Sequence, residues 1–221
     1  MSLKESILYI LNNDVKPAVG CTEPVAIALA CAAAKSVIKG EVDKVVVQLS
    51  PNVYKNGMNV GIPGIDEIGL DVAGALGVAK GDPSEGLSLL GSIDNSMKEY
   101  AKSLLKEEKV KVELLDTPKR MYIESIITSG DNVSKAIIED KHDNITGIYL
   151  NNECVFSSKN EEVSATTGGL DDSFFEYPII DIIEEVEKLD FKDIEYMLEG
   201  IKMNRQAAEL GMSSKLGIGV G

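Results

Sequence analysis

The chain has 221 residues, which is enough for one large or two small domains with a hydrophobic core. Its formal net charge of -14 argues against binding to nucleic acid and to anionic membrane surfaces, because both require clustered Lys and Arg. The longest apolar run, residues 24–34, is shorter than the roughly 20 residues that span a bilayer. We expect a cytoplasmic protein, since three cysteines without paired spacing and the lack of a secretory signal indicate a reducing compartment.

The first hundred residues predict helices and a single strand. Residues 6–12 predict a short helix, and residues 22–38 predict a helix that is apolar on nearly every face and therefore buried. The β-branched run at residues 44–50 predicts a strand covered on both faces. Residues 51–65 are rich in Gly and Asn and predict a loop with a tight Asn-Gly turn.

Two further predicted helices follow, and the spacing of the apolar residues then changes from helical to alternating. Residues 66–79 have helical spacing, and Asp-Pro-Ser-Glu opens a single long helix at residues 82–106. Alternating apolar and polar residues then predict an antiparallel β-meander with one wet face. Its expected strands are residues 110–114, 121–128, 133–139, 145–150 and 153–157.

The remainder completes an α+β architecture. Residues 158–172 predict a polar loop, and residues 178–189 and 191–210 predict two helices, the second capped by Asp190. We therefore expect a β-meander flanked by helices, with a buried Ala-rich helix, in one or two lobes. Its parts are a helical part with one strand at about 1–107, the meander at about 108–157, and helices at about 173–221.

Cys21 is the strongest candidate for chemistry. It stands at the predicted start of the Ala-rich helix, where Pro24 suits the first turn and Thr22 can cap the free N–H groups. A thiol at this position is close to the positive end of the helix dipole, which stabilises the thiolate that binds metal or attacks an electrophile. The alternative is a small buried residue at a tight turn.

Other reactive residues fit ordinary structural roles. His142 lies in a polar turn, so we expect it to be a solvated surface histidine. Because it is the only histidine of the chain, this disfavours Ser-His-Asp and Cys-His catalysis. No Cys-x-x-Cys or His-x-x-x-His spacing indicates zinc, and the glycines of residues 57–64 match no nucleotide-binding fingerprint. That loop could still cradle a carboxylate. Cys31 is expected to be a small core hydrophobe, and Cys154 to pack in the core or at a sheet edge.

Three stretches of the chain resemble a known family. Residues 17–24 (Pro-Ala-Val-Gly-Cys-Thr-Glu-Pro) and residues 52–64 resemble two motifs of the L-cysteine desulfidase family, which shares the serine dehydratase alpha-chain homology. A third set resembles the start of the later helical part of that family: Asn204, Ala207, Gly211, Gly217 and Gly219. The resemblance covers essentially the whole chain but about the first half of a family member. It implies that residues 1–221 are an N-terminal portion whose partner is a missing C-terminal portion.

The resemblance implies a [4Fe-4S] enzyme that uses neither pyridoxal phosphate nor a nucleotide. Such enzymes cleave L-cysteine to pyruvate, ammonia and sulfide, or dehydrate L-serine, with three cysteines on the cluster and one iron open as a Lewis acid. Cys21 matches the first of these cysteines. Glu23 is the catalytic candidate, and the substrate-binding candidates are Thr22, Asn56 and Asn59. Because nothing after Cys154 supplies further cysteines, this chain alone is expected to hold no complete cluster and to be inactive.

Several alternatives stay open. The chain is either a lyase acting on a small amino acid, a non-catalytic amino-acid-binding domain of the same fold, or a structural domain in which Cys21 is sealed off. The sequence does not choose between cysteine and serine as substrate, and it does not identify the general base. Oligomeric state is also open, with a homo-oligomer as one option.

Overall fold

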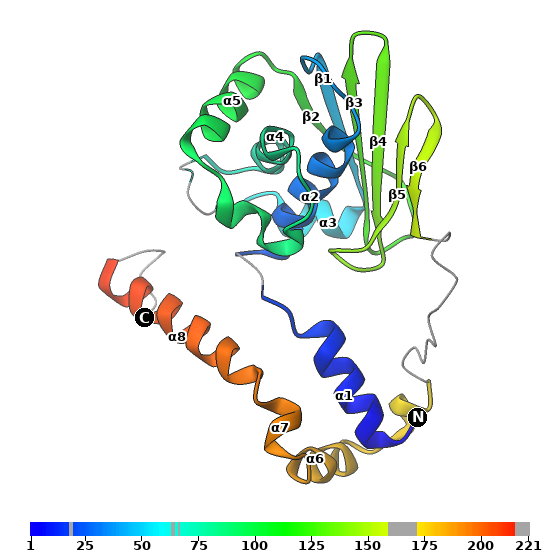
Figure 1. The fold of residues 1–221 in the computed structure, drawn as a ribbon, viewed down its shortest axis with the longest axis vertical. Helices are drawn as coiled ribbons and strands as arrows, with labels where there is room; N and C mark the ends of the chain where they lie inside the picture. The colour runs from blue at the N-terminus through cyan, green and yellow to red at the C-terminus, as the bar shows by residue number, and fades with distance from the viewer. Residues whose placement is uncertain (18–19, 63–64, 66, 159–171, 215–221) are drawn as a thin grey trace. The chain divides into compact units, whose positions relative to one another are not determined.

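The computed structural model describes residues 1–17, 20–62, 65, 67–158 and 172–214 (Figure 1). The chain divides into two compact units, which are considered separately: a sheet unit (Ala18–Ala165) and a helical unit (Met1–Pro17 with Thr166–Gly221). The sheet unit contains a six-stranded mixed sheet with helices packed on it, so the predicted α+β class is confirmed. Among the described residues, no helix combines the length and the apolar character needed to cross a membrane.

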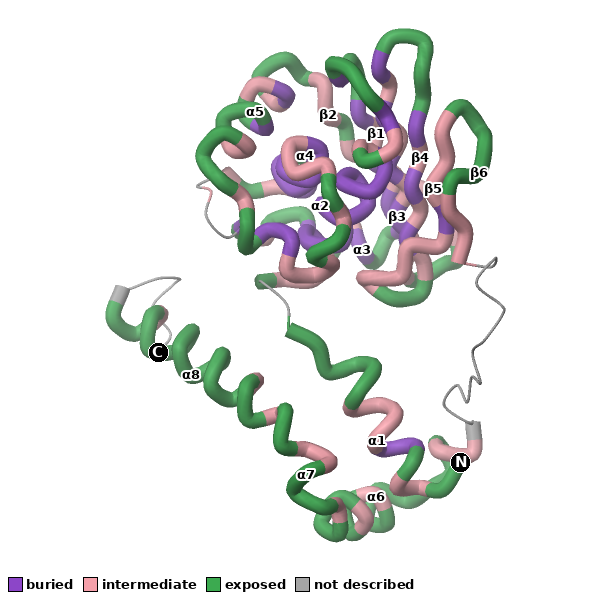
Figure 2. The backbone as a smooth tube through the Cα atoms, in the orientation of Figure 1, coloured by how far each residue is buried: buried purple, intermediate pink, exposed green. Residues whose placement is uncertain are grey.

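Helix α2 (Thr22–Ser36) is the centre of the sheet unit. Every residue from 24 to 34 is buried, as its all-round apolar pattern predicts, and Figure 2 shows α2 within the buried core. Helix α4 (Leu70–Lys80) packs directly against α2. Gly77 makes this close approach possible, because a Cβ there would collide with the backbone of Ala28.

The strand order of the sheet is β2-β1-β3-β4-β5-β6. The strands are β1 (Lys44–Leu49), β2 (Val110–Leu114), β3 (Tyr122–Ser129), β4 (Asn132–Glu139), β5 (Ile145–Leu150) and β6 (Glu153–Ser157). Strands β3 to β6 form the predicted antiparallel meander. The prediction that β2 belongs to this meander is wrong, since β2 pairs in parallel with β1. The helices between β1 and β2 form a crossover that returns the chain in the same direction.

One face of the sheet carries the core. Helices α2 and α4 contact the sheet, and α5 (Asn95–Lys106) packs on α4 (Figure 1). The strict alternation of buried and half-exposed residues along β3 confirms the predicted wet face. The prediction that β1 is covered on both faces is wrong. Val45 and Val47 are buried, whereas Val46 and Gln48 on the other face are only half-buried.

Two predicted segments of the sheet unit differ locally. Part of the expected loop at residues 51–65 is a helix, α3 (Pro51–Gly57), which Pro51 opens at the first helical position. The expected long helix at residues 82–106 is divided into the 3-10 helix η1 (Gly86–Ser92) and α5. Asp94 starts α5 anew, because its Oδ1 accepts a hydrogen bond from the Met97 amide at 2.8 Å.

The helical unit is built from α1 (Leu3–Asp14), α6 (Ile179–Glu187), α7 (Phe191–Ile194) and α8 (Met197–Ser214), with a 3-10 turn, η3 (Asp172–Glu176). Helix α1 packs against α6, and Lys4 Nζ lies 3.1 Å from Asp193 Oδ2. The predicted helix at residues 191–210 is interrupted after α7. Asp190 is at the N-cap of α7 but makes no capping hydrogen bond. Most of the predicted loop, residues 159–171, and residues 215–221 lie outside the described residues.

Two glycines of α4 allow a matched test of the packing between α2 and α4. Gly77→Ala should lower the free energy of unfolding by about 2 kcal/mol or more, because the new methyl group meets the rigid Ala28 backbone. Gly74→Ala should be neutral or stabilising by up to about 1 kcal/mol, since its Cβ meets side chains at 3.4–3.5 Å and alanine favours the helix. Urea unfolding followed by far-UV circular dichroism measures both. Equal losses in the two variants would contradict the packing described above.

Candidate functional site

The candidate site begins at the amino end of α2. Cys21 is the N-cap residue, with extended backbone angles (φ -74°, ψ 134°) and no capping hydrogen bond from its side chain. Its half-buried thiol instead donates to Glu23 Oε2, 2.9 Å from Sγ. Thr22 is the first helical residue and not the cap that the sequence predicts, and its hydroxyl lies 3.5 Å from the same carboxylate oxygen.

The second carboxylate oxygen of Glu23 contacts residues from two other parts of the sheet unit. Asn56 Nδ2, from α3, donates to Glu23 Oε1 at 3.1 Å. His142 Nε2, from the turn between β4 and β5, lies 3.9 Å from the same oxygen. We call Cys21, Glu23, Asn56 and His142 the Glu23 cluster. With Thr22 beside this cluster, the structure brings four of the five predicted site residues together and adds a histidine.

Asn59 and His142 depart from their predicted surroundings. Asn59, a predicted substrate-binding residue, is exposed in the turn after α3 and makes no hydrogen bond to the Glu23 cluster among the described contacts. His142 was expected to be solvated, yet its side chain is only 36% exposed and faces Glu23. No local pattern in the sequence identifies this contact, because 119 positions separate the two residues in the chain.

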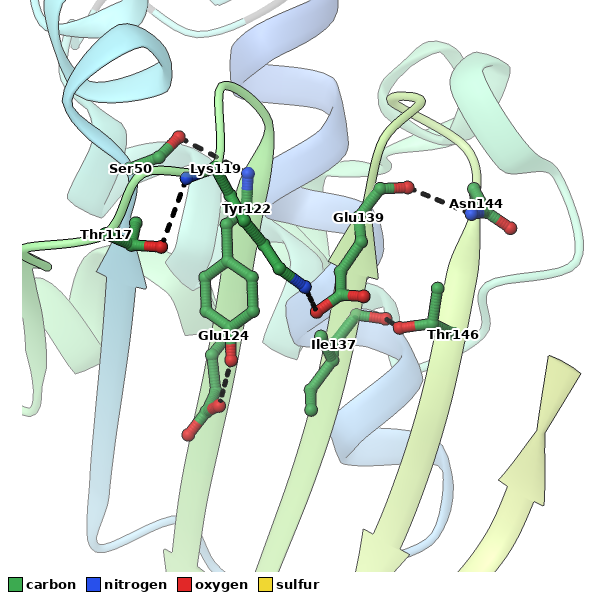
Figure 3. Close-up of polar contacts among 9 residues, drawn as sticks. All are labelled: Ser50, Thr117, Lys119, Tyr122, Glu124, Ile137, Glu139, Asn144 and Thr146. Atoms are coloured by element: carbon green, nitrogen blue, oxygen red, sulfur yellow. Dashed lines mark hydrogen bonds and ion pairs between the residues drawn. The ribbon is translucent and has the colours of Figure 1, made fainter. Parts of the chain in front are cut away.

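The turn that carries His142 is held by polar contacts at both ends (Figure 3). Asn144 Nδ2 donates to the Glu139 carbonyl oxygen at 2.9 Å, and the Asn144 amide donates to the Lys141 carbonyl at 3.2 Å. Lys119 Nζ lies 2.5 Å from Glu139 Oε1, which ties the turn to the segment before β3. These contacts give His142 a defined place at the end of the sheet where β1 leads into α3.

Helix α3 is fixed at both of its ends. Ser50, its N-cap residue, donates its hydroxyl proton to the Arg120 carbonyl at 3.0 Å and accepts from the Tyr122 amide at 3.3 Å. At the other end, a Cβ on Gly57 would lie 3.4 Å from Glu23 Cβ and even closer to Leu70. Glycine therefore lets α3 pack closely against Leu70 and Glu23, next to Asn56.

A cavity of about 320 Å³ lies on the Leu70 side of α3. Its lining comes from α3 and the turn that follows, from the start of α4 and from β2: Tyr54, Met58, Gly69, Leu70, Asp71, Val110, Lys111 and Val112. Gly57 is adjacent both to Leu70 in this lining and to Glu23. The cavity and the Glu23 cluster therefore share one helix but are lined by different side chains.

The electrostatics of Cys21 oppose the prediction from the helix dipole. Burial raises the pKa of the Cys21 thiol, and the hydrogen bond to the Glu23 carboxylate raises it further. The backbone N–H groups of Glu23 and Thr22 lower it by less. Cys21 therefore rests as a protonated thiol, and the predicted stabilised thiolate is not found.

Glu23 behaves in the opposite way. Burial alone would raise the pKa of its carboxyl group, but hydrogen bonds from Cys21 and Asn56, together with the nearby His142, lower it on balance. Glu23 is therefore a charged acceptor that holds a thiol on one oxygen and an amide on the other.

The other two cysteines lie elsewhere in the sheet unit. Cys31 is fully buried within α2, as expected, with its Sγ 3.3 Å from Ser125 Oγ, and burial raises its pKa to about 12. Cys154 is exposed on the edge strand β6. In the part of the chain that the structure describes, no group of three His, Cys, Asp or Glu side chains could hold a metal ion. The donors of the described residues therefore do not fit a complete [4Fe-4S] cluster, which is held by several Cys thiolates together.

The contact between Cys21 and Glu23 predicts a shift in thiol reactivity. In a Cys154→Ser background, Glu23→Gln should move the pH midpoint of Cys21 alkylation to lower pH, because the variant lacks the charge that disfavours the thiolate. Iodoacetamide labelling followed by mass spectrometry gives the pH profile. Asp71→Asn removes another carboxylate in the first turn of a helix and serves as the control. An unchanged midpoint in Glu23→Gln would show that this hydrogen bond does not control the thiol.

Comparison with known proteins gives a consistent set of relatives, although no family model matches the chain. A UPF0597 protein of Clostridioides difficile is 39% identical over 220 residues, which cover 97% of this chain and 51% of the relative. UPF0597 proteins of Alkaliphilus oremlandii and Clostridium tetani are 39% and 35% identical, over 100% of this chain and 51% and 52% of each relative. The chain spans about half the length of these curated relatives.

These relatives correct the resemblance described above. The chain is similar to UPF0597 proteins along essentially its whole length. The interpretation of the chain as an N-terminal portion of an L-cysteine desulfidase or serine dehydratase alpha chain is therefore wrong. The motifs at residues 17–24 and 52–64 and a third set of residues from Asn204 to Gly219 suggested it, but the chain aligns along 97–100% of its length with UPF0597 proteins.

Proposed function

We propose that the Glu23 cluster binds a small α-amino acid and is part of the active site of a lyase. This lyase eliminates the β-substituent of L-cysteine or L-serine. The observation that carries this proposal is the pairing at the start of α2. Cys21 Sγ lies 2.9 Å from one oxygen of Glu23, with Asn56 and His142 at the other oxygen. The pair lies at the part-buried start of a helix whose residues 24–34 are enclosed, so its polar groups are among the few that α2 leaves unburied.

The residues present complement both charges of an amino acid. The charged Glu23 carboxylate is an acceptor for the substrate ammonium group. The Asn56 amide, the Thr22 hydroxyl and the first free N–H groups of α2 are donors for the substrate carboxylate. A zwitterion is thus matched without a cluster of lysines or arginines.

Elimination requires a proton acceptor, and His142 is the candidate. The His142 imidazole, whose Nε2 lies 3.9 Å from Glu23 Oε1, is placed to take the α-proton while the β-substituent leaves as sulfide or hydroxide. The aminoacrylate that remains takes up water and breaks down to pyruvate and ammonia. Glu23 accepts a hydrogen bond from the Cys21 thiol and keeps that thiol oriented during this step.

An iron-sulfur cluster belongs to this proposal only for the longer relatives. Cys21 offers one thiol ligand, and a cluster with an open iron would supply a Lewis acid for the leaving group. Because the described residues do not supply the other ligands, no step is assigned to it. The three free cysteines and the amino-acid substrate agree with a proposed place in the reducing cytoplasm.

A non-catalytic amino-acid-binding domain is the second candidate. The raised pKa of Cys21 favours it, since a protonated thiol is a poor nucleophile and a poor metal ligand. Both candidates require amino-acid binding at Glu23, and they differ in turnover.

Calorimetric titration of this chain with L-serine and L-cysteine tests the shared requirement. Glu23→Gln and Asn56→Ala should each weaken binding about tenfold or more, because each removes a polar contact to the zwitterion. Asn59→Ala is the matched control, since it removes an exposed asparagine outside the cluster. If neither amino acid binds, or if all three variants bind equally, both candidate functions fail.

Turnover separates the two candidates. The Clostridioides difficile relative, reconstituted anaerobically with iron and sulfide, should form pyruvate from L-cysteine or L-serine if the lyase proposal holds. Substitution of the residue aligned with Cys21 by alanine should abolish that activity. Binding without pyruvate in the intact relative would favour the non-catalytic domain.

A further inference from the structure

Helices α6 to α8 expose an unusual amount of apolar surface. Ile179 is 71% exposed on α6, Ile201 is 64% exposed on α8, and Met212 near the end of α8 is 75% exposed. Other large exposed side chains of the helical unit are Phe175, Ile180, Ile183, Val186, Phe191, Leu198, Met203 and Leu210. Figure 2 shows these helices almost entirely as exposed or intermediate. Exposed large apolar side chains that gather in one segment of a chain mark an interaction surface.

Helix α6 separates a covered side from an uncovered side. Helix α1 packs on α6, where Ile182 and Leu189 just beyond its end are half-buried. Ile179, Ile183 and Val186 recur at the spacing of a single helix face and are all exposed. This second apolar stripe has no partner among the described elements of the helical unit.

Helix α8 needs external support even more. None of its residues with a described side chain is buried along the 18 residues from Met197 to Ser214. In proteins, most helix stability comes from the packing of an apolar face and not from intrinsic helix propensity. Ile201 and Leu198 lie one turn apart and are both exposed. Such a helix becomes stable when another surface covers it.

Charge indicates what kind of surface this is. Acidic residues outnumber basic ones along residues 172–214, with Glu184, Glu187, Asp190, Glu195 and Glu199 among them. A second copy of the chain would bring the same acidic rim against itself, which costs free energy. The complementary surface is apolar in the middle and carries Lys or Arg at its edge.

The length of the relatives offers a candidate occupant for the apolar surface. The relatives align with 97–100% of this chain, so they contain this segment, and they hold about as much polypeptide again. A segment of the same polypeptide is present at high effective concentration, which favours docking without a large interface. We propose that the exposed faces of α6 and α8 dock against the polypeptide that corresponds to the other half of these longer relatives.

Hydrogen-deuterium exchange tests this docking by comparing this chain with the intact Clostridioides difficile relative. In this chain, amides of α8 should exchange at nearly unstructured rates, with protection below about tenfold. In the intact relative, the aligned segment should exchange at least about a hundredfold more slowly, because the second half covers it. Light scattering at several concentrations reports the oligomeric state of each protein in parallel.

Matched variants locate the face. In the intact relative, serine at the positions aligned with Ile183 and Ile201 should remove the added protection of α8. Serine at the position aligned with Val155, a similarly exposed apolar residue on β6, should leave it unchanged.

Four outcomes would overturn the proposal: protection of α8 already in this chain as a monomer, protection that appears only with concentration-dependent dimerisation, no added protection in the intact relative, or equal effects of all variants. The wild-type comparison is decisive even where a variant fails to fold.

Discussion

The enclosure of α2 on every side is the constraint on which the sheet unit depends. An eleven-residue stretch without a charged side chain, residues 24–34, gains stability only if all of its faces leave water. The sheet covers one side and α4 covers another at backbone contact, where Gly77 meets Ala28. Because the whole body of the helix is used for packing, its polar groups stand only at its two ends: Lys35 and Ser36 in the last turn, and the residues around Cys21 and Glu23 in the first. The position of Cys21 and Glu23 is therefore a consequence of how the core is built.

Within that first turn, two electrostatic effects compete for the thiol. The amino end of a helix behaves like about half a positive unit charge and favours the thiolate. Glu23 carries a full negative charge, its carboxylate oxygen lies 2.9 Å from the sulfur, and partial burial adds to the cost of ionising Cys21. The nearer and larger charge wins, so the thiol stays protonated. A partner that binds Cys21 as thiolate requires that the thiol first loses its proton. The nearest acceptor for that proton is the Glu23 carboxylate.

Local sequence patterns predicted most of the elements but not the contacts between them. The apolar run of α2 and the alternation of β3 are periodic signals, and both were confirmed. The parallel pairing of β2 with β1 depends on a crossover of about sixty residues, which no local pattern encodes. The proximity of His142 to Glu23 likewise depends on how the hairpin between β4 and β5 is placed, through contacts such as Lys119 to Glu139. The sequence placed Cys21 at the start of a helix, as found. It did not show the hydrogen bond to Glu23 that keeps the thiol protonated.

The two units differ in how far each satisfies its own apolar surface. The sheet unit buries a large set of apolar side chains in one continuous core, whereas the described residues of the helical unit bury little beyond Ile7. Most of the free energy that folds the described residues must therefore come from the sheet unit. It follows that the Glu23 cluster, which lies wholly within the sheet unit, has a rigid framework of its own, held by Gly57, Ser50 and Asn144. The helical unit, with its second apolar stripe, depends for its order on whatever surface covers α6 and α8.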